Sequence, residues 1–588
     1  MNQALNSLRQ EMQQKGIDAY LIFNTDDHNS EYIAEDYMFV KFLSGFSGDN
    51  AVVVVTENFA GLWTDSRYFI SAEKELKNSE IKLMKSSIDI SYWQYIKENI
   101  KQSGKVSCNG KVITAQNFLK LKKLLSEQNI SFDNSTDLST EIWQNRPKKK
   151  LSKIFYLDEK FSGENILIKL SKIREKIKKH NADYFLTSGL DDIAWTLNLR
   201  ASDISFCPVF FSFLIIEKEK ETFLFADQNR FDETIKNYLE KANVKILPYN
   251  EVYNFHSQIP ESKVIMLDTK TVNSRLYTSF SQKIIDTASP IQLMKAVKNA
   301  TELKNFETAM IEDGVAMEKF FYKFEKNLEK NVPMTELSAA KMLLDERKKS
   351  KNFLFESFEC ISAFNLHAAM PHYAPNEKDD CAIEKDGVYL VDSGGQYLLG
   401  TTDITRTIPT GKFSLDFARD YTLVLIGNLN LAMQKFPSGT TGSRLDVLAR
   451  QALWQHGLDF GHGTGHGVGY CLNCHEGPHG FSSSASKNNS IALEEGMIIT
   501  DEPGFYKEGF YGIRHENMLE VKKSKLKDFM EFSVMTLCHI DTRPIVKSLL
   551  TLPQIEFLNA YNKNVYDTLE KYLNKEEKEY LKNKTLPI

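Results

Sequence analysis

Cysteine and long apolar runs are scarce in this sequence. Only seven of the 588 residues are cysteine, an odd number without regular spacing, which excludes a disulfide framework. No stretch approaches the roughly 18 consecutive apolar residues that a transmembrane helix needs. The N-terminal segment has neither the apolar core nor the small-residue cleavage site of a secretion signal. We therefore expect a cytoplasmic protein without a membrane partner.

Basic residues do not outnumber acidic residues in this sequence. The chain has 73 Lys and Arg residues against 78 Asp and Glu, so its formal net charge is -5. A nucleic-acid-binding protein needs a basic face, and we expect no nucleic-acid partner. The one dense basic run, residues 148–150, follows Pro147 and is typical of a solvated linker.

The sequence does have the length and composition of a globular protein with several domains. It is 42% hydrophobic and 26% charged, and 588 residues are too many for one core. A helix followed by a strand at the N-terminus recurs at 170–187, where Asp183 aligns with Asp18 and Leu186 with Leu21. This repetition predicts two related αβ domains, at 1–150 and 151–292.

A different pattern begins near residue 290 and predicts a third domain, 293–588. After Pro290 the apolar spacing indicates a long amphipathic helix, and Asn299 with Glu302 could cap its start. Further helices are predicted at 335–349, about 414–435 and 443–456, and a hairpin at 386–409 with its turn around 397–400. The fold class expected is α/β (α+β).

Residues 461–478, "GHGTGHGVGYCLNCHEGP", combine glycines, histidines and two cysteines. Cys471, Cys474 and His475 fit the pattern of covalent haem attachment, and the cysteine pair also resembles half a zinc site. Covalent haem is normally attached outside the cytoplasm, and the chain contains no second C-x-x-C pair. We therefore expect both cysteines to be small packing residues.

Four acidic residues lie on or at the ends of predicted strands of the third domain. Asp392 and Asp403 lie on opposite arms of the hairpin, where facing residues are about 4.5–5.5 Å apart. Glu502 and Glu516 belong to the later apolar strands. One such acid is usually a solvated turn residue, but four buried carboxylates repel one another unless a cation holds them. Oxygen ligands with one imidazole favour a divalent ion such as Mn²⁺.

The motifs around these acids carry a family resemblance. "VDSGGQY", "GTTDITRT", "HGTGHGVG", "TDEPGFY" and "IRHEN" occur in this order. With them the sequence resembles the pita-bread metallopeptidases, most closely the three-domain Xaa-Pro aminopeptidases (aminopeptidase P). "GLWTDSRYF" and "LDDIAWTLNLR" extend the resemblance towards the N-terminus. It implies two creatinase-like αβ domains followed by a pita-bread catalytic domain.

The resemblance also implies a dinuclear metal site. Its five ligands would be Asp392, Asp403, His466, Glu502 and Glu516. Asp403 and Glu516 would bridge two divalent ions, expected to be Mn²⁺. A hydroxide shared by the ions would attack the peptide bond, and Glu502 would accept the proton of the attacking water.

Further residues are implied to contact the substrate. His475 would stabilise the scissile carbonyl oxygen, His372 would lie near the leaving nitrogen, and His462 would line the proline pocket. Arg67 would be contributed by the first domain. The plainer alternative is a satisfied structural histidine in each case, and an ion pair with Asp65 for Arg67. The remaining histidines considered are expected to be structural or surface residues: His367, His456, His479 and His539.

The function that the resemblance implies is release of the N-terminal residue from peptides with proline in the second position, by a homodimeric enzyme. An X-Pro amide has no N–H, so such a site must fit the ring instead. Three alternatives remain: a prolidase restricted to dipeptides, a creatinase without metal carboxylates, and a catalytically inactive pita-bread binding module. Two departures from the family are His515 beside Glu516, usually apolar, and Ser66 beside Arg67, commonly Gly.

Overall fold

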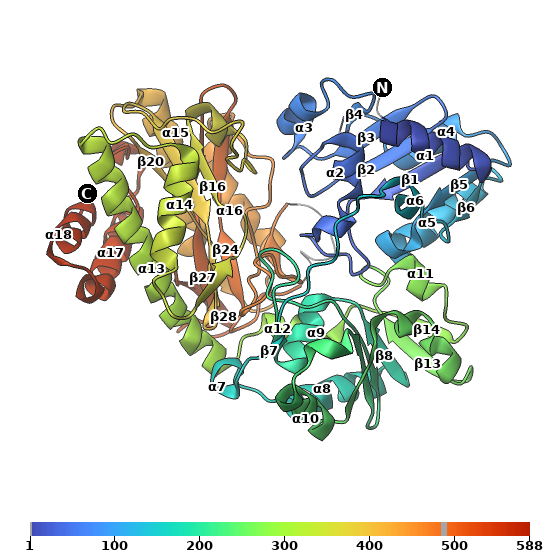
Figure 1. The fold of residues 1–588 in the computed structure, drawn as a ribbon. Coiled ribbons are helices and arrows are strands. Elements are labelled where there is room, and N and C mark those ends of the chain that lie inside the picture. The colour runs from blue at the N-terminus through green and yellow to red at the C-terminus, as the bar shows by residue number, and fades with distance from the viewer. Residues whose placement is uncertain (1–2, 87, 484–490) are drawn as a thin grey trace. The chain divides into compact units, whose positions relative to one another are not determined.

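The structure of the chain is a computed structural model that describes residues 3–86, 88–483 and 491–588 (Figure 1). It divides into two compact units. The first consists of Met1–Asp158 and Glu164–Ile291, and the second of Glu159–Gly163 and Gln292–Ile588. In the part of the chain that is described, no helix combines the length and the apolar character needed to cross a bilayer.

The first unit contains two six-stranded sheets with the same topology. In the first sheet the order is β4-β3-β2-β1-β5-β6, with β1 Ala19–Phe23, β2 Val52–Thr56, β3 Ala60–Thr64, β4 Lys82–Lys85, β5 Lys105–Cys108 and β6 Ser131–Asp133. In the second it is β12-β11-β10-β8-β13-β14, with β8 Tyr184–Thr187, β10 Phe213–Glu217, β11 Thr222–Ala226, β12 Val244–Pro248, β13 Val264–Leu267 and β14 Lys283–Asp286. In each sheet the first strand pairs antiparallel with the second and parallel with the fifth.

The internal duplication predicted from the sequence is confirmed in detail. Asp18 and Asp183 play the same part, since each stands before the first strand of its sheet. The carboxylate of Asp18 accepts the backbone N–H of Lys105 at 2.8 Å, and that of Asp183 accepts Val264 N–H at 2.9 Å. The helices that precede these strands, α1 Gln3–Gln14 and α8 Ile166–Lys179, bury apolar residues at helical spacing.

The basic run at 148–150 is not simply a solvated linker. Lys148 and Lys150 are exposed, but the ammonium group of Lys149 lies 3.8 Å from the centroid of the Phe211 ring and 5.0 Å from the Tyr37 ring. Aromatic faces can replace water around a cation. The prediction is therefore wrong for Lys149, which contacts Tyr37 from the part of the unit with the first sheet and Phe211 from the part with the second sheet.

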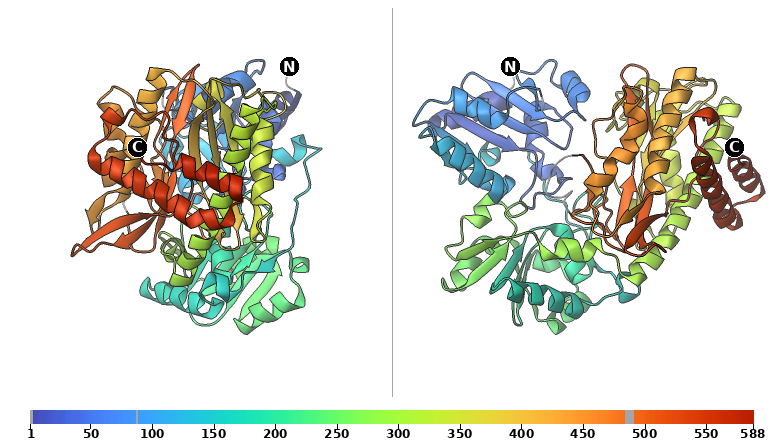
Figure 2. Two further views of the ribbon diagram at one scale, coloured as in Figure 1. Left: turned by 90° about the vertical axis from the view of Figure 1, so that its left-hand side faces the viewer. Right: turned by 180° about the vertical axis from the view of Figure 1, so that it is seen from behind.

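The second unit has two layers, each with a sheet covered by helices (Figure 2). Helices α13 Ala300–Glu329 and α14 Glu336–Arg347 pack their apolar side chains on a sheet of β16 Ile361–Phe364, β17 Val388–Ser393 and β20 Ile404–Pro409. Helices α15 Leu415–Ala432 and α16 Gly442–Trp454 pack on β24 Ile498–Asp501, β27 Asn517–Lys523, β28 Phe529–Val534 and β21 Lys435–Pro437. The sequence predicted this succession of helix pairs and strands.

The long helix begins after Asn299, where the sequence predicted its cap. A short helix, α12 Pro290–Ala296, comes first, and Asn299 then caps α13. The predicted capping box is confirmed, because the Asn299 side chain accepts the Glu302 N–H while the Glu302 carboxylate accepts the Asn299 N–H. The box fixes the start of a 30-residue helix that spans the layer.

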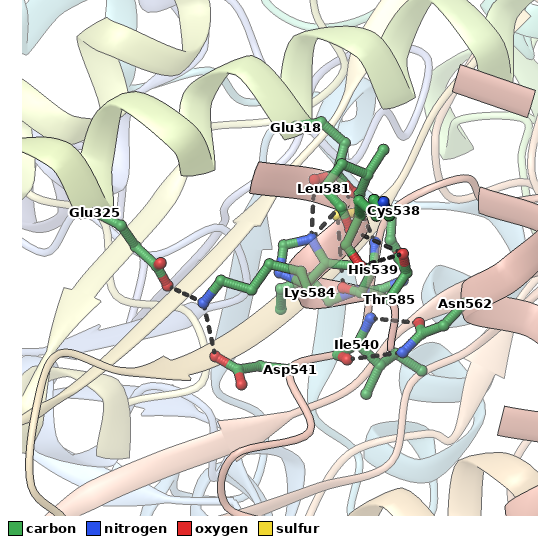
Figure 3. A network of polar contacts seen from close by, with 12 residues as sticks. Glu318, Glu325, Cys538, His539, Ile540, Asp541, Asn562, Leu581, Lys584 and Thr585 are labelled. Atoms are coloured by element: carbon green, nitrogen blue, oxygen red, sulfur yellow. Dashed lines mark hydrogen bonds and ion pairs between the residues drawn. The ribbon is translucent and has the colours of Figure 1, made fainter. Parts of the chain in front are cut away.

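The C-terminal helices, α17 Leu552–Leu569 and α18 Lys575–Lys584, are tied to the same layer (Figure 3). Lys584 on α18 pairs with Glu325 on α13 at 2.6 Å and lies 3.9 Å from Asp541. Glu318, about two turns before Glu325 on the same helix, accepts hydrogen bonds from His539. The C-terminal segment is thus held by buried polar contacts as well as by apolar packing.

Candidate metal centre

The predicted hairpin brings Asp392 and Asp403 to one region, but not directly opposite each other. The register of β17 and β20 pairs Asp392 with Thr405. Asp403 lies between β19 Gly400–Thr401 and β20. Here the outer part of the hairpin, β18 Gly395–Tyr397 with β19, separates into another small sheet. Asp392 and Asp403 are therefore not facing residues of one ladder, because the hairpin changes sheets between its two acids.

His466 lies beside three of the acidic residues. Its Nε2 is 3.4 Å from Asp403 Oδ2 and 3.6 Å from Glu502 Oε1. Ligand atoms of Asp403, His466 and Glu516 all lie within 4.8 Å of one another. The Nδ1 of His466 is 2.9 Å from the carbonyl oxygen of Gly467, so Nδ1 carries a hydrogen and Nε2 is the ring nitrogen that faces the acids.

The electrostatics of the site reflect several buried acids held close together. Burial raises the pKa of Asp392, Glu502 and Glu516, and the charges of neighbouring carboxylates raise each further. For Glu502 the pKa rises to about 7. Asp403 is the exception: burial opposes its ionisation, but the hydrogen bond from His466 and the charges of His466 and His475 lower its pKa.

The acidic cluster, defined as Asp392, Asp403, His466, Glu502 and Glu516, fits divalent cations. Asp392, Asp403 and Glu516 are at most 7% exposed. Among the described residues, the Oδ1 atom of Asp392 is buried without a hydrogen-bond partner. An orphaned carboxylate oxygen beside mutually repelling acids is stabilised when cations are present. The donor set of carboxylates with one imidazole suits hard or borderline divalent ions.

The glycines of the histidine loop allow close backbone contacts. A Cβ atom at Gly465 would lie 1.9 Å from the carbonyl oxygen of Thr500, and one at Gly467 would lie 2.2 Å from that of Glu476. The hydroxyl of Thr500 accepts a hydrogen bond from the backbone N–H of His466 at 3.0 Å. The loop thereby packs closely on β24, which ends at Asp501 directly before Glu502, and this contact fixes where the imidazole lies.

Arg514 and Tyr506 belong to the site although no prediction named them. Arg514 donates to Asp392 Oδ2 from Nη2 at 2.5 Å and from Nε at 3.2 Å. Its Nη1 donates to the hydroxyl of Tyr506 at 2.5 Å, and that hydroxyl is 2.8 Å from His462 Nε2. A polar chain therefore runs from Asp392 to His462. The sequence did offer one indication that Arg514 belongs to the site, because Arg514 stands two residues before Glu516 in the "IRHEN" motif.

The predicted substrate histidines lie near this cluster. The His475 ring is 4.3 Å from the His466 ring at an interplanar angle of 86°. His372 follows Pro371, whose carbonyl oxygen accepts from Arg514 Nη2 at 3.5 Å. Arg67 belongs to the first unit and pairs with Asp65 at 2.8 Å, as the plainer alternative expects. Its role at the substrate stays a prediction.

Cys471 and Cys474 are both buried, but Cys474 is more than a packing residue. Its thiol donates to Asp403 Oδ2 at 3.1 Å. Sequence reasoning missed this contact because Asp403 and Cys474 are 71 residues apart. All seven cysteines are free thiols.

His515 is a buried neutral side chain. It is 1% exposed, and its two ring nitrogens have no hydrogen-bond partner among the described residues. Burial lowers the pKa of His515 to about 3. The ring packs edge-on against Tyr421 with centroids 4.4 Å apart. This histidine therefore behaves like the apolar residue that the family usually has beside this glutamate.

The histidines predicted to be structural or surface residues each contact a protein acceptor. His456 and His479 face backbone carbonyl oxygens, whereas His367 and His539 face the carboxylates of Glu336 and Glu318.

Comparison with known proteins covers the whole chain. The creatinase/prolidase N-terminal domain matches twice, at residues 5–146 and 145–302. Metallopeptidase family M24 matches 304–523, and the C-terminal region of peptidase M24 matches 528–588. "Xaa-Pro aminopeptidase 1" of Dictyostelium discoideum is 37% identical over 100% of this chain and 97% of its own. "Probable Xaa-Pro aminopeptidase P" of Coprinopsis cinerea is 36% identical over 99% of this chain and 98% of its own.

A solved structure is similar over the full length. It is described as an X-prolyl aminopeptidase from Caenorhabditis elegans, a cytosolic enzyme with a di-nuclear active site. It superposes with a TM-score of 0.95 at 34% identity, covering 100% of this chain and 99% of that one. An Xaa-Pro dipeptidase from Bacillus anthracis shares the fold over 63% of this chain, with a TM-score of 0.51 and 23% identity.

Proposed function

The chain belongs to metallopeptidase family M24, and from this premise we propose that it is a metal-dependent Xaa-Pro aminopeptidase. It releases the N-terminal residue from peptides with proline in the second position. The observation that carries the proposal is the acidic cluster, which combines four carboxylates with one imidazole and in which Asp392 has an orphaned buried oxygen. Full-length similarity to Xaa-Pro aminopeptidases supports the same activity.

Two divalent cations are proposed as the cofactor. Asp403 and Glu516 would contact both ions, Asp392 would complete one coordination sphere, and His466 with Glu502 would complete the other. When bound, such a pair of ions lowers the pKa of a coordinated water and stabilises negative charge on the scissile carbonyl oxygen. Mn²⁺ is the proposed metal because oxygen donors outnumber the single nitrogen donor.

The protein residues supply proton transfer and positioning. Burial and neighbouring acids raise the pKa of Glu502 to about 7, which suits a group that accepts a proton from water near neutral pH. His475, beside His466, would donate a hydrogen bond to the scissile carbonyl oxygen. His372 would face the leaving nitrogen. His462 would line the pocket of the proline ring, and Tyr506 and Arg514 hold His462 in place.

Two rival functions make different predictions. A prolidase cleaves only dipeptides, whereas the proposed enzyme cleaves an X-Pro-Pro peptide efficiently. A binding module would have lost ligands, but all five ligand positions here carry ligand side chains. The deciding experiment measures metal content and hydrolysis of an X-Pro-Pro peptide and an X-Pro dipeptide in parallel. Preference for the dipeptide would favour prolidase, and absence of both metal and hydrolysis would favour the binding module.

The remaining expectations are proposals of the same kind. We propose a cytoplasmic homodimer, to which Arg67 of the first unit contributes a substrate contact. The cytosolic description of the C. elegans relative supports the location. Sedimentation of the metal-loaded protein tests the dimer, and Arg67→Ala tests the contact, which should raise KM with both metals retained.

A further inference from the structure

Glu336, the first residue of α14, is a buried carboxylate outside the acidic cluster. It is 0% exposed. Its Oε1 accepts the Phe364 N–H at 2.6 Å, and its Oε2 accepts the Tyr373 hydroxyl at 2.7 Å. His367 Nδ1 lies 2.9 Å from Oε2 and 3.1 Å from Oε1. Because a carboxylate can only accept here, Nδ1 carries the hydrogen.

These three donors belong to one segment of the chain, residues 364–373. Phe364 ends β16, His367 lies in the following 3₁₀ turn Asn365–Ala369, and Tyr373 comes directly after His372. The rings of His367 and Tyr373 also pack together, with centroids 4.4 Å apart. One carboxylate therefore fixes the beginning, the middle and the end of the segment that carries His372.

The other side of this segment lies against the strand leading to Glu516. A Cβ atom at Gly512, in β26 Tyr511–Arg514, would lie only 1.7 Å from the carbonyl oxygen of Ala368. Arg514 Nη2 contacts the carbonyl oxygen of Pro371 at 3.5 Å while also donating to Asp392. The segment is thus held between Glu336 and the residues that flank the acidic cluster.

Glu336, His367 and Cys381 also have the residue types of a metal site, with ligand atoms within 4.8 Å of one another. The carboxylate, however, already accepts three donors from its own chain. A cation there would have to displace hydrogen bonds, whereas the acidic cluster has carboxylates in excess of donors. The contacts therefore favour a hydrogen-bonded hub over a third metal ion.

We propose that Glu336 is the positioning residue that holds His372 towards the leaving nitrogen of the substrate. The inference rests on the proposed function. A glutamine at this position keeps one acceptor oxygen but turns an N–H₂ group towards a donor. One anchor of the segment is then lost, and a shift of about 1 Å in a reacting group can lower the rate by about 10²-fold.

The test compares Glu336→Gln with a matched control on the same helix. Glu346 is also a buried glutamate of α14, 4% exposed, and pairs with Lys323 and Lys349 away from the segment. We expect Glu336→Gln to lower kcat on an X-Pro-Pro peptide by about 10- to 100-fold. KM should stay within about threefold, with two metals retained. Glu346→Gln should keep kcat within about twofold of wild type.

A double-mutant cycle with His372 distinguishes positioning from general destabilisation. If Glu336 acts through His372, adding Glu336→Gln to His372→Ala should cost little further activity. Tyr373→Phe, which removes one anchor only, provides a milder variant should Glu336→Gln fold poorly, with an expected loss in kcat of about 3- to 10-fold.

Three results would overturn the inference. They are an unchanged kcat in both Glu336→Gln and Tyr373→Phe, multiplicative losses in the double variant, or a third bound ion that is lost with Glu336→Gln. Wild type is assayed first in the same experiment. A wild type that cleaves no X-Pro peptide refutes the proposed function, whereas an active wild type with any of these results refutes the role of Glu336 alone.

Discussion

Two buried clusters of the second unit contain the same side-chain types and differ in what they leave unsatisfied. The acidic cluster has four carboxylates and His466, with the thiol of Cys474 beside Asp403. The Glu318 cluster, which consists of Glu318, Cys538 and His539, has one carboxylate, one imidazole and one thiol within 4.8 Å (Figure 3).

The Glu318 cluster is complete without a cation. The Glu318 carboxylate accepts the backbone N–H of His539 at 2.8 Å and faces Nδ1 of the same residue at 2.9 Å. In the acidic cluster the acids outnumber the donors, and the pKa of Glu516 is raised well above its usual range by burial and by neighbouring acids. The balance of charge and donors, rather than ligand types alone, distinguishes a metal site from a structural one.

The largest effect is expected from removing a shared ligand of the acidic cluster. Asp403→Asn should lower kcat by at least about 10³-fold and reduce the metal content, because the ions lose a bridging charge. Glu318→Gln should leave two metals per chain and lower only thermal stability. Elemental analysis and steady-state kinetics check both variants. At most one ion per wild-type chain under saturating Mn²⁺, or full activity in Asp403→Asn, would contradict the dinuclear site.

The next largest effects are expected from the histidines, which should affect catalysis near the acidic cluster but not in the Glu318 cluster. His475→Ala should lower kcat by about 10²–10³-fold with a modest change in KM and both metals retained, because its hydrogen bond is needed mainly in the transition state. His462→Ala should instead change the discrimination between X-Pro and X-Ala substrates. His539→Ala is the control from the Glu318 cluster and should leave kcat unchanged. An unaltered kcat in His475→Ala removes that residue from the mechanism.

The pH dependence of stability should have opposite signs in the two regions. In the metal-free protein Glu502 has its pKa raised from 4.5 to about 7 by burial and neighbouring acids. Between these values the folded chain holds a proton that the unfolded chain releases, so stability falls as pH rises. The change is about 1–3 kcal/mol. Glu502→Gln should reduce this fall in denaturant titrations of the metal-free protein, and the raised pKa values of Asp392 and Glu516 account for the fall that remains.

Asp541, beside the Glu318 cluster, behaves in the opposite way. Burial opposes its ionisation, but Arg543 and Lys584 lower its pKa from 3.8 to about 2. Its contribution is therefore present above pH 3.8 and is lost as the pH falls towards 2. Asp541→Asn should reduce the loss of stability between pH 3.8 and pH 2 and leave the pH dependence above that range unchanged. A change in the pH dependence of stability between pH 4.5 and pH 7 in Asp541→Asn would contradict this contrast between the two regions.

The smallest effect is expected from the cysteines. Cys471→Ala with Cys474→Ala should leave metal content and kcat largely intact, since a thiol is a weak donor to Asp403 and neither cysteine belongs to the ligand set. Cys538→Ala is the matched change in the Glu318 cluster. A haem absorbance band, or loss of metal in the double variant, would contradict this prediction.

Sequence analysis could predict elements whose cause is local. The capping box of Asn299, the strand at 19–23 and the equivalence of Asp18 and Asp183 depend on spacing within short segments, and the structure has all three. The five proposed ligands were found because each lies in a distinctive motif.

Contacts between distant segments could not be predicted in this way. The sheet change that displaces Asp403 from Asp392, the thiol contact of Cys474 and the hub at Glu336 depend on tertiary packing. The ring contacts of Lys149 belong to the same class. A charge pattern predicts solvation unless the fold supplies another environment, and no local signal marks that exception.

Arg514 has a consequence for how the chain folds. Its guanidinium joins Asp392, Tyr506 and the carbonyl oxygen of Pro371, and the first and last of these lie 122 and 143 residues away in the sequence. Contacts of such high sequence separation form only after long loops have closed. The metal-binding geometry should therefore arise late in folding, so a partly folded chain would have its helices in place before it could hold a metal ion.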